Sequence, residues 1–191
     1  MKYAVGVLVI VLIVGGIFLG FNAGKEQTTK TGSSPVSTTV TAPSGNVLDL
    51  SNKGITSVGP DIYNKTDTST LILSNNNIRT LPSEMGKLNN LVVFRIDHNI
   101  LDGSLIGEVR QMSKLKQLDV SYNKMTGMPA ELGQLNSLET LNYSYNSITG
   151  LPNELGNLKN NLKEFNLTGN PLSQSQITKL KSELPNTNTI F

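Results

Sequence analysis

Apolar and polar residues alternate in a recurring pattern from Asn46 to the end of the chain. Five segments fit LxxLxLxxNxL, where L is any apolar residue, and Thr68 is the main departure. They are residues 68–78, 91–101, 115–125, 138–148 and 162–172. The asparagine recurs every 23 or 24 residues. A period of this length is typical of a repeat protein.

The alternation within each segment is the period of a strand with one buried face. A strand that short cannot bury its face alone, so strands of successive repeats have to stack in parallel. The pattern therefore predicts an α/β solenoid with one short parallel strand in each repeat.

The second half of the repeat also has a regular pattern. Residues 81–88, 128–135 and 151–158 share Pro, Glu and Gly at the same positions. Proline suits the first helical turn, glutamate favours the positive helix end, and glycine closes a helix. We predict a short helical or 3-10 turn here in each repeat. The third repeat has Ile106 where the proline is expected, which predicts a looser turn.

The end of the chain has the pattern of a cap. Ser173, with Gln176 three residues later, is typical of a helix start. Apolar residues then follow at i, i+3 and i+7 on one helical face, until Pro185 stops the helix. Such a helix would cover the last core layer of a solenoid.

These repeats resemble the leucine-rich-repeat family, and the resemblance covers residues 46–191. It implies a short right-handed horseshoe with a concave parallel sheet, short helical or 3-10 turns on the convex side, and a C-terminal helical cap from about residue 173. It also implies that the recurring asparagines form a structural ladder, because an amide side chain can satisfy backbone groups where each strand turns away. The ladder residues are Asn76, Asn99, Asn123, Asn146 and Asn170.

In this architecture the variable positions of LxxLxLxx lie on the concave face. The position just before the ladder asparagine carries a ring in three successive repeats: His98, Tyr122 and Tyr145. The row beside it is polar: Arg95, Asp119, Asn142 and Asn166. Tyr and Arg are enriched in binding hot spots, so we predict that these seven residues bind the ligand. In the alternative, the rings only pack along the sheet and shield the asparagines.

The first residues of the chain predict a membrane anchor. Residues 3–21 carry no charge, and nineteen helical residues span about 29 Å, close to the ~30 Å hydrocarbon thickness. We predict an uncleaved transmembrane helix within residues 1–24, with a disordered Ser/Thr/Pro-rich linker at 25–45 and the repeats outside the cytoplasm. A signal peptide, cleaved to release a secreted protein, is the alternative, although bulky Phe21 disfavours cleavage.

Composition excludes several kinds of function. The net charge of +2 is too small to indicate a nucleic-acid partner. The absence of cysteine excludes disulfides and thiolate metal sites and argues against a eukaryotic secreted origin, so we expect a bacterial protein.

Nothing in the sequence indicates catalysis. The chain has a single histidine and no recognisable set of nucleophile and base, so we expect no enzyme, no cofactor and no metal site. We expect a membrane-tethered module that binds a protein on its concave face. The alternatives are a cell-envelope or adhesion protein that binds glycan, with sugar rings stacked on the tyrosines, and an accessory subunit of a signalling complex.

Overall fold

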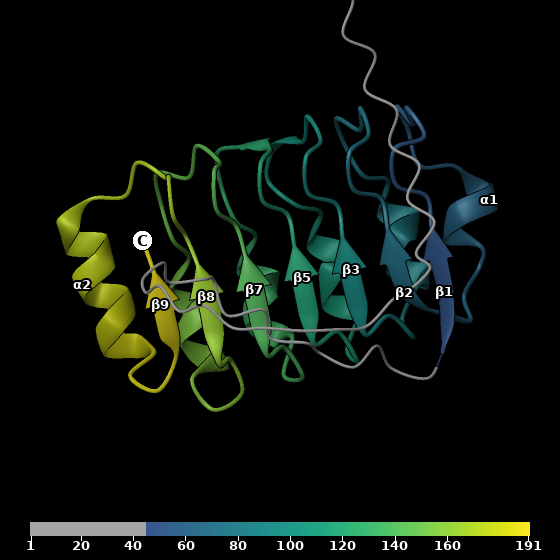
Figure 1. The fold of residues 1–191 in the computed structure, drawn as a ribbon. Helices are drawn as coiled ribbons and strands as arrows, with labels where there is room; N and C mark the ends of the chain where they lie inside the picture. The colour runs from purple at the N-terminus through teal and green to yellow at the C-terminus, as the bar shows by residue number, and fades with distance from the viewer. Residues whose placement is uncertain (1–44) are drawn as a thin grey trace, which may run out of the picture. The chain divides into compact units, whose positions relative to one another are not determined.

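The repeats build one continuous parallel sheet, as Figure 1 shows for the computed structural model, which describes residues 45–191. Its seven strands follow the chain in the order β1-β2-β3-β5-β7-β8-β9, so each repeat pairs with the next one. They are β1 (Asn46–Asp49), β2 (Thr68–Ile72), β3 (Val93–Arg95), β5 (Gln117–Asp119), β7 (Thr140–Asn142), β8 (Glu164–Asn166) and β9 (Asn188–Ile190). The predicted parallel solenoid is confirmed.

Short helical turns lie behind the sheet in Figure 1, one for each repeat. They are α1 (Pro60–Tyr63) and the 3-10 helices η1 (Ser83–Lys87), η2 (Gly107–Gln111), η3 (Ala130–Gln134) and η4 (Asn153–Leu158). The recurring proline is the N-cap residue of η1, η3 and η4, one residue before the predicted first turn. Its fixed φ still sets the direction in which each helix begins.

The prediction of a looser turn at Ile106 is wrong. Ile106 caps η2 with φ −65° and ψ 143°, close to the φ −74° and ψ 142° of Pro129 at the start of η3. The neighbouring repeats impose this extended conformation, because η2 is packed between η1 and η3. Tertiary packing therefore replaces the restraint that the proline ring supplies elsewhere.

The core lies between the sheet and the helical turns. The inward-facing residue in the middle of each central strand is almost completely buried: Leu71, Phe94, Leu118, Leu141 and Phe165. They share one core cluster with the buried residues of the turns behind the sheet, as the alternating pattern predicts. Tyr143, which stands at a core leucine position, is also fully buried.

The glycines of the helical turns have a different role from the predicted one. Gly86 and Gly133 lie inside η1 and η3 and are buried, so they do not end these helices. A Cβ added to Gly133 would lie 2.2 Å from the backbone oxygen of Glu154 in the next repeat. Glycine is therefore required at this position because η3 and η4 approach each other closely.

The asparagines form hydrogen bonds between neighbouring repeats. The Oδ1 atom of Asn99 accepts from the Ile78 N–H at 2.9 Å, and its Nδ2 donates to the Leu73 and Ile96 carbonyls at 2.9 and 3.2 Å. Equivalent bonds join the preceding repeat to each of the other ladder residues, Asn76, Asn123, Asn146 and Asn170. The ladder satisfies backbone groups just beyond the strands, where the sheet no longer does so.

The last repeat ends in the predicted helical cap. Helix α2 (Gln174–Glu183) begins at Ser173, whose side chain accepts from the Gln176 N–H while the Gln176 side chain accepts from the Ser173 N–H. Its Leu180 is buried against the solenoid, and β9 then adds the final strand of the sheet. The cap therefore covers the last core layer, as expected for a solenoid end.

The predicted membrane helix at residues 3–21 and nearly all of the predicted linker at 25–45 lie outside the described residues. Within residues 45–191, no helix has both the length and the apolar character needed to cross a membrane.

Candidate functional site

Four of the predicted ligand-binding residues lie in one row across the concave sheet. Strand register aligns Arg95 with Asp119, then with Asn142 and Asn166 on the following strands. Arg95 is exposed, and its guanidinium forms no salt bridge within residues 45–191. A guanidinium of this kind can pair with a carboxylate through two parallel hydrogen bonds.

The other three residues of this row also stabilise their own strands. The Oδ1 atom of Asp119 accepts from the backbone N–H of Ser121 at 3.0 Å, and Asn142 and Asn166 accept in the same way two residues later. The Asn142 Nδ2 also donates to the second carboxylate oxygen of Asp119 at 3.2 Å. These side chains are half-buried and held in place, so they line the surface without being free to reorient.

The rings of His98, Tyr122 and Tyr145 stack into an aromatic column. Their centroids are 4.3 and 4.4 Å apart, with interplanar angles of 16° and 19°. The tyrosines are 45% and 47% exposed, and they are among the few large apolar side chains of the described region that reach the solvent. Desolvation by the stack, and then the neighbouring Tyr145 phenol, raise the pKa of the Tyr122 phenol.

Asp97 fixes the orientation of the first ring. Its Oδ2 atom lies 2.9 Å from Nδ1 of His98, while its Oδ1 accepts from the Ser74 hydroxyl at 2.5 Å. The imidazole is therefore held with Nδ1 towards the sheet, and Nε2 is the nitrogen that remains for a ligand.

The backbone of the aromatic column has an unusual conformation. His98, Tyr122 and Tyr145 have φ values of 53°, 52° and 54°, in the left-handed region. The same position in the other repeats is occupied by Asn52, Asn75 and Gly169, also at positive φ. Gly, Asn and His are the residues most often found in this conformation, whereas a tyrosine in it costs free energy of order 1–3 kcal/mol.

The sequence pattern revealed this column but not its strain. The strain could have been inferred from the residues at the same position of the other repeats. These are Asn52, Asn75 and Gly169, and Asn and Gly are typical of a left-handed backbone. The two tyrosines therefore stand where the backbone conformation favours a smaller residue.

The stacking also determines which parts of the rings a ligand can reach. Tyr122 has a ring against each of its faces. Tyr145 lies over Gly169, where an added Cβ would come within 2.9 Å of its Cδ1. The column therefore presents ring edges and polar groups to the solvent, while most of the ring faces are covered.

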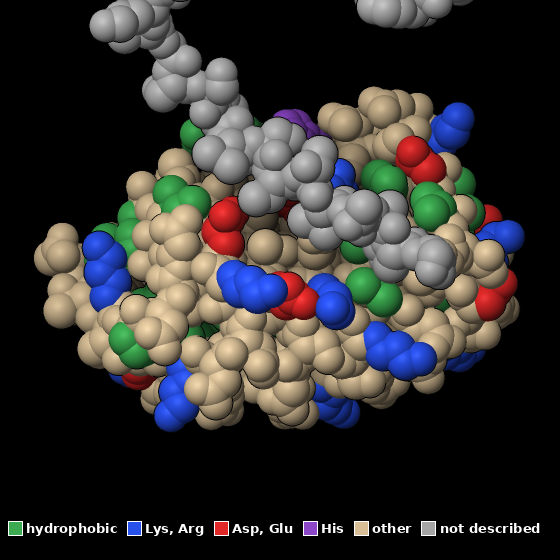
Figure 2. Space-filling model, turned by 60° about the horizontal axis from the view of Figure 1, so that its bottom comes forward, with side chains coloured by type: hydrophobic (Ala, Val, Ile, Leu, Met, Phe, Trp, Pro, Cys, Tyr) green, Lys and Arg blue, Asp and Glu red, His purple; other side chains and the backbone are tan. Residues whose placement is uncertain are grey.

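The charged side chains of residues 45–191 do not gather into a metal-binding group. No group of three His, Asp or Glu side chains within residues 45–191 lies close enough to hold a metal ion. Figure 2, which brings the lower edge of Figure 1 forward, shows lysine and arginine side chains interspersed with acidic ones on the face in view. Binding to a nucleic-acid backbone, by contrast, relies on many lysine and arginine contacts to phosphate.

Comparison with known proteins finds the same repeat. The family model described as Leucine Rich Repeat matches residues 68–88 and 137–158. Lumican from Oryctolagus cuniculus is 42% identical over 62 residues, which cover 31% of this chain and 32% of lumican. The chain spans a third or less of the length of the curated relatives that it matches.

Solved structures match a larger part of the chain. A leucine-rich-repeat protein of Leptospira interrogans has a TM-score of 0.56 at 28% identity, covering 70% of this chain and 40% of its own. A chain of the BIR3–SERK2 complex from Arabidopsis thaliana has a TM-score of 0.56 at 26% identity, covering 66% of this chain and 68% of its own. The second of these structures is a complex of two proteins.

Proposed function

We propose that this leucine-rich-repeat protein is a non-catalytic module that binds another protein through its concave face. The observation that carries the proposal is the aromatic column of His98, Tyr122 and Tyr145, which is exposed, ordered by stacking and placed on a strained backbone. Exposed tyrosines that are already ordered lose little conformational entropy when a partner binds.

The surface beside the column has the mixed chemistry of a protein interface. Arg95 supplies a cation that forms no salt bridge within residues 45–191, and Ile72 precedes it in the same row of the sheet. Asp119 and Asn142, which follow Arg95 in this row, supply fixed polar groups. A combination of rings, one arginine and held polar side chains is typical of binding hot spots.

Stacking favours a protein ligand over a glycan. A sugar binds to tyrosine by laying its apolar face on a free ring face, and the central ring, Tyr122, has none to offer. Ring edges and phenol hydroxyls are better suited to the carbonyls, carboxylates and side chains of a protein. The complex of BIR3 with SERK2 supports the same kind of partner by analogy of fold.

We also propose that residues 3–21 tether this module to a membrane, with the repeats outside the cytoplasm. The support is the uncharged apolar sequence, which has the length needed to cross a bilayer as a helix. Tethering would confine the concave face to partners at the same cell surface.

Affinity capture with the full chain tests the binding proposal. The bait is compared with a concave variant, Arg95→Ala/Tyr122→Ala/Tyr145→Ala, and with a control that alters the convex side, Arg110→Ala/Gln111→Ala/Gln134→Ala. We expect quantitative mass spectrometry to find proteins retained by the wild type and the control but lost by the concave variant. Retention of the same proteins by all three baits would contradict binding at the concave face.

Treatment of the extract separates the two classes of ligand. Protease digestion before capture should remove the species that depend on Arg95 and the tyrosines, whereas glycosidase digestion should leave them. Loss on glycosidase treatment alone would favour the glycan alternative.

A further inference from the structure

Between the ladder asparagine and the next helical turn, each repeat runs along one flank of the solenoid, just beyond the sheet. The third repeat has one more residue in this segment than its neighbours. Leu81, Met128 and Leu151 each follow their ladder asparagine by five residues, whereas Leu105 follows Asn99 by six. The extra residue lies in the segment with Gly103, whose φ of +69° requires glycine. Only this segment of the described flank forms a second, two-stranded sheet, between β4 (Asp102–Gly103) and β6 (Lys124–Met125).

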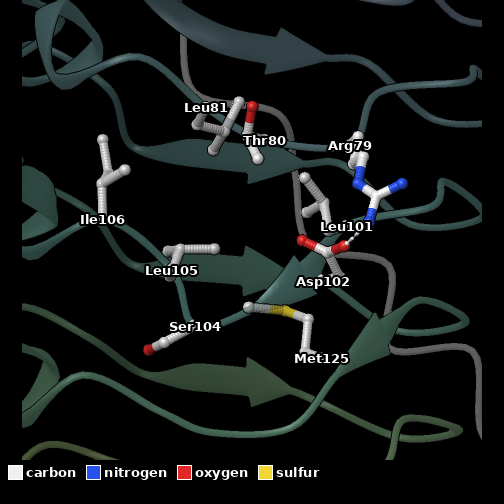
Figure 3. A pocket seen from close by; sticks show the side chains of 9 residues that line it. All are labelled: Arg79, Thr80, Leu81, Leu101, Asp102, Ser104, Leu105, Ile106 and Met125. Carbon is white, nitrogen blue, oxygen red and sulfur yellow. Dashed lines mark ion pairs between the residues drawn. The ribbon is translucent and has the colours of Figure 1, made fainter.

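A hollow of about 180 Å³ opens beside this insertion (Figure 3). Leu81, Leu105, Ile106 and Met125 form apolar walls, and Leu81 and Ile106 are only half-buried. At one end, Arg79 Nη2 pairs with Asp102 Oδ2 at 2.6 Å, as the dashed line in Figure 3 marks. Ile106 lies at the opposite end.

Size decides what this hollow can hold. Pockets for cofactors and drug-sized ligands have volumes of roughly 300–1,000 Å³, well above that of this hollow. An apolar cavity of about 150 Å³ holds a benzene ring. The hollow therefore matches one leucine-sized or phenylalanine-sized side chain.

Charge and position indicate where that side chain comes from. The ion pair at the end of the hollow brings opposite charges together, so the entrance suits an uncharged group better than a lipid or organic anion. Ile100, two residues after His98 of the aromatic column, is exposed and lies on the stretch of chain that leads from the column to the hollow. One exposed apolar side chain thus lies between the column and the hollow along the chain.

We infer that the hollow lined by Leu81, Leu105, Ile106 and Met125 is an anchor pocket for one apolar side chain of the protein that binds the aromatic column. The inference rests on the proposed function for the identity of the partner. It adds a second contact, outside the concave face, beside the insertion of the third repeat. Anchoring in a fitted pocket is typical of the residues that contribute most to protein–protein affinity.

Methyl NMR of the full chain tests the pocket without the partner. The probes are N-acetyl-L-leucinamide and N-acetyl-L-phenylalaninamide, with N-acetyl-L-alaninamide and N-acetylglucosamine as controls. We expect saturable shifts of the Leu81, Leu105, Ile106 and Met125 methyls with the first two probes at millimolar concentration, and at least tenfold weaker effects with the controls. Shifts spread over the whole surface, or equal effects of the sugar, would overturn the inference.

A plugged variant supplies the matched comparison. Ser104 is exposed and lines the hollow, so Ser104→Leu should fill it, whereas Gly150→Leu changes the corresponding position of a repeat without the insertion. Unperturbed core methyl signals would show that both variants fold. We expect Ser104→Leu to abolish the probe-induced shifts and Gly150→Leu to preserve them; equal shifts in both variants would refute the pocket.

The same variants separate this inference from the proposed function. The concave triple variant should bind the small probes as the wild type does, because it leaves the hollow intact. For a captured partner that needs the concave residues, Ser104→Leu should also lower the affinity at least tenfold. If that partner binds Ser104→Leu normally, the anchor is refuted while the concave site stands. If the probes bind but no partner needs the column, the concave proposal and the shared partner fail, and only a pocket for an apolar side chain stands.

Discussion

At the scale of single residues, the informative positions are those where the residue type disagrees with its local environment. Tyr122 and Tyr145 occupy a left-handed backbone that Asn52, Asn75 and Gly169 occupy elsewhere. Tyr143 has a polar atom in the core. The first disagreement supports the proposed binding site, whereas no function for the second follows from the structure.

Exchange of Tyr122 for asparagine separates folding from binding. Tyr122→Asn should keep the free energy of unfolding within about 1 kcal/mol of the wild type, because asparagine relieves backbone strain while two stacking contacts are lost. Partner affinity should fall at least tenfold. Chemical denaturation and titration with a captured partner measure the two effects. A large loss of stability with unchanged affinity would indicate that the ring only supports the fold.

Because the hydroxyl of Tyr143 is buried, we predict that phenylalanine, which lacks this group, is tolerated or preferred at position 143. It has no hydrogen-bond partner among the described residues, and burial raises the pKa of this phenol. Tyr143→Phe should raise the free energy of unfolding by about 1 kcal/mol, because it removes an unpaired polar atom from the core. Urea denaturation, with exposed Tyr145→Phe as the control, checks this. Destabilisation by Tyr143→Phe would mean that the hydroxyl is satisfied by water.

At the scale of elements, the stacked 3-10 helices depend on close backbone approach. Gly133 of η3 and Gly156 of η4 stand at the same position of the repeat motif. An added Cβ would clash with the backbone of Glu154 at the first, whereas its nearest neighbour at the second is a Glu183 side-chain carbon at 3.6 Å. The same sequence motif therefore has two different structural requirements.

Alanine at these two glycines should have unequal effects. Gly133→Ala should lower the free energy of unfolding by about 1–3 kcal/mol, because η3 and η4 have to move apart. Gly156→Ala should be neutral or slightly stabilising, because the site has room and alanine favours a helix. Thermal and urea unfolding of both variants provide the comparison. Equal losses would show that the motif needs glycine for a reason other than packing.

The starts of the strands are linked by a charge ladder across three repeats. Glu139 Oε1 lies 3.1 Å from Lys116 Nζ, and its Oε2 lies 2.5 Å from Lys163 Nζ. Hydrogen bonds from Lys163 and then Lys116 lower the pKa of Glu139 below its ordinary value of 4.5. The folded state therefore favours the ionised carboxylate.

This ladder predicts a pH-dependent contribution to stability. Because folding lowers the pKa of Glu139, its contribution is present above pH 4.5 and is lost as the pH falls through the lower folded value. Both lysines are more than half exposed, so Glu139→Gln should cost at most about 1 kcal/mol at pH 7. Denaturation at pH 7 and pH 3 should show a smaller difference at pH 3 than at pH 7. An equal difference at both pH values would have another cause.

At the scale of the whole molecule, the solenoid presents two different faces. The sheet carries the aromatic column, and the helical turns carry the close contacts that fix the spacing of the repeats. The anchor pocket lies on the flank between them. A partner that uses both the column and the pocket would wrap around one edge of the third repeat.

Membrane tethering is the prediction that belongs to this scale. In intact cells expressing the full chain, added protease should degrade the repeats without lysis, and the protein should stay with the membranes after alkaline carbonate extraction. These results follow from an anchor at residues 3–21 with the repeats outside the cytoplasm. Degradation only after lysis would reverse the orientation, and release into the medium would favour a cleaved signal peptide.

The sequence by itself determined the repeat architecture, because its apolar period dictates parallel strands that bury one face against their neighbours. It also placed the cap helix at Ser173 and the aromatic column at one position of the repeat. These features depend on local period and residue type, which a single chain displays directly.

Only the tertiary structure decided what depends on distances between repeats. The clash that makes Gly133 necessary, the conformation of Ile106 without a proline, the covered ring faces and the hollow beside Gly103 all arise where neighbouring repeats meet. A period in the sequence shows that such repeats stack. It does not show how closely they approach, because that distance is set by the packing of many side chains at once.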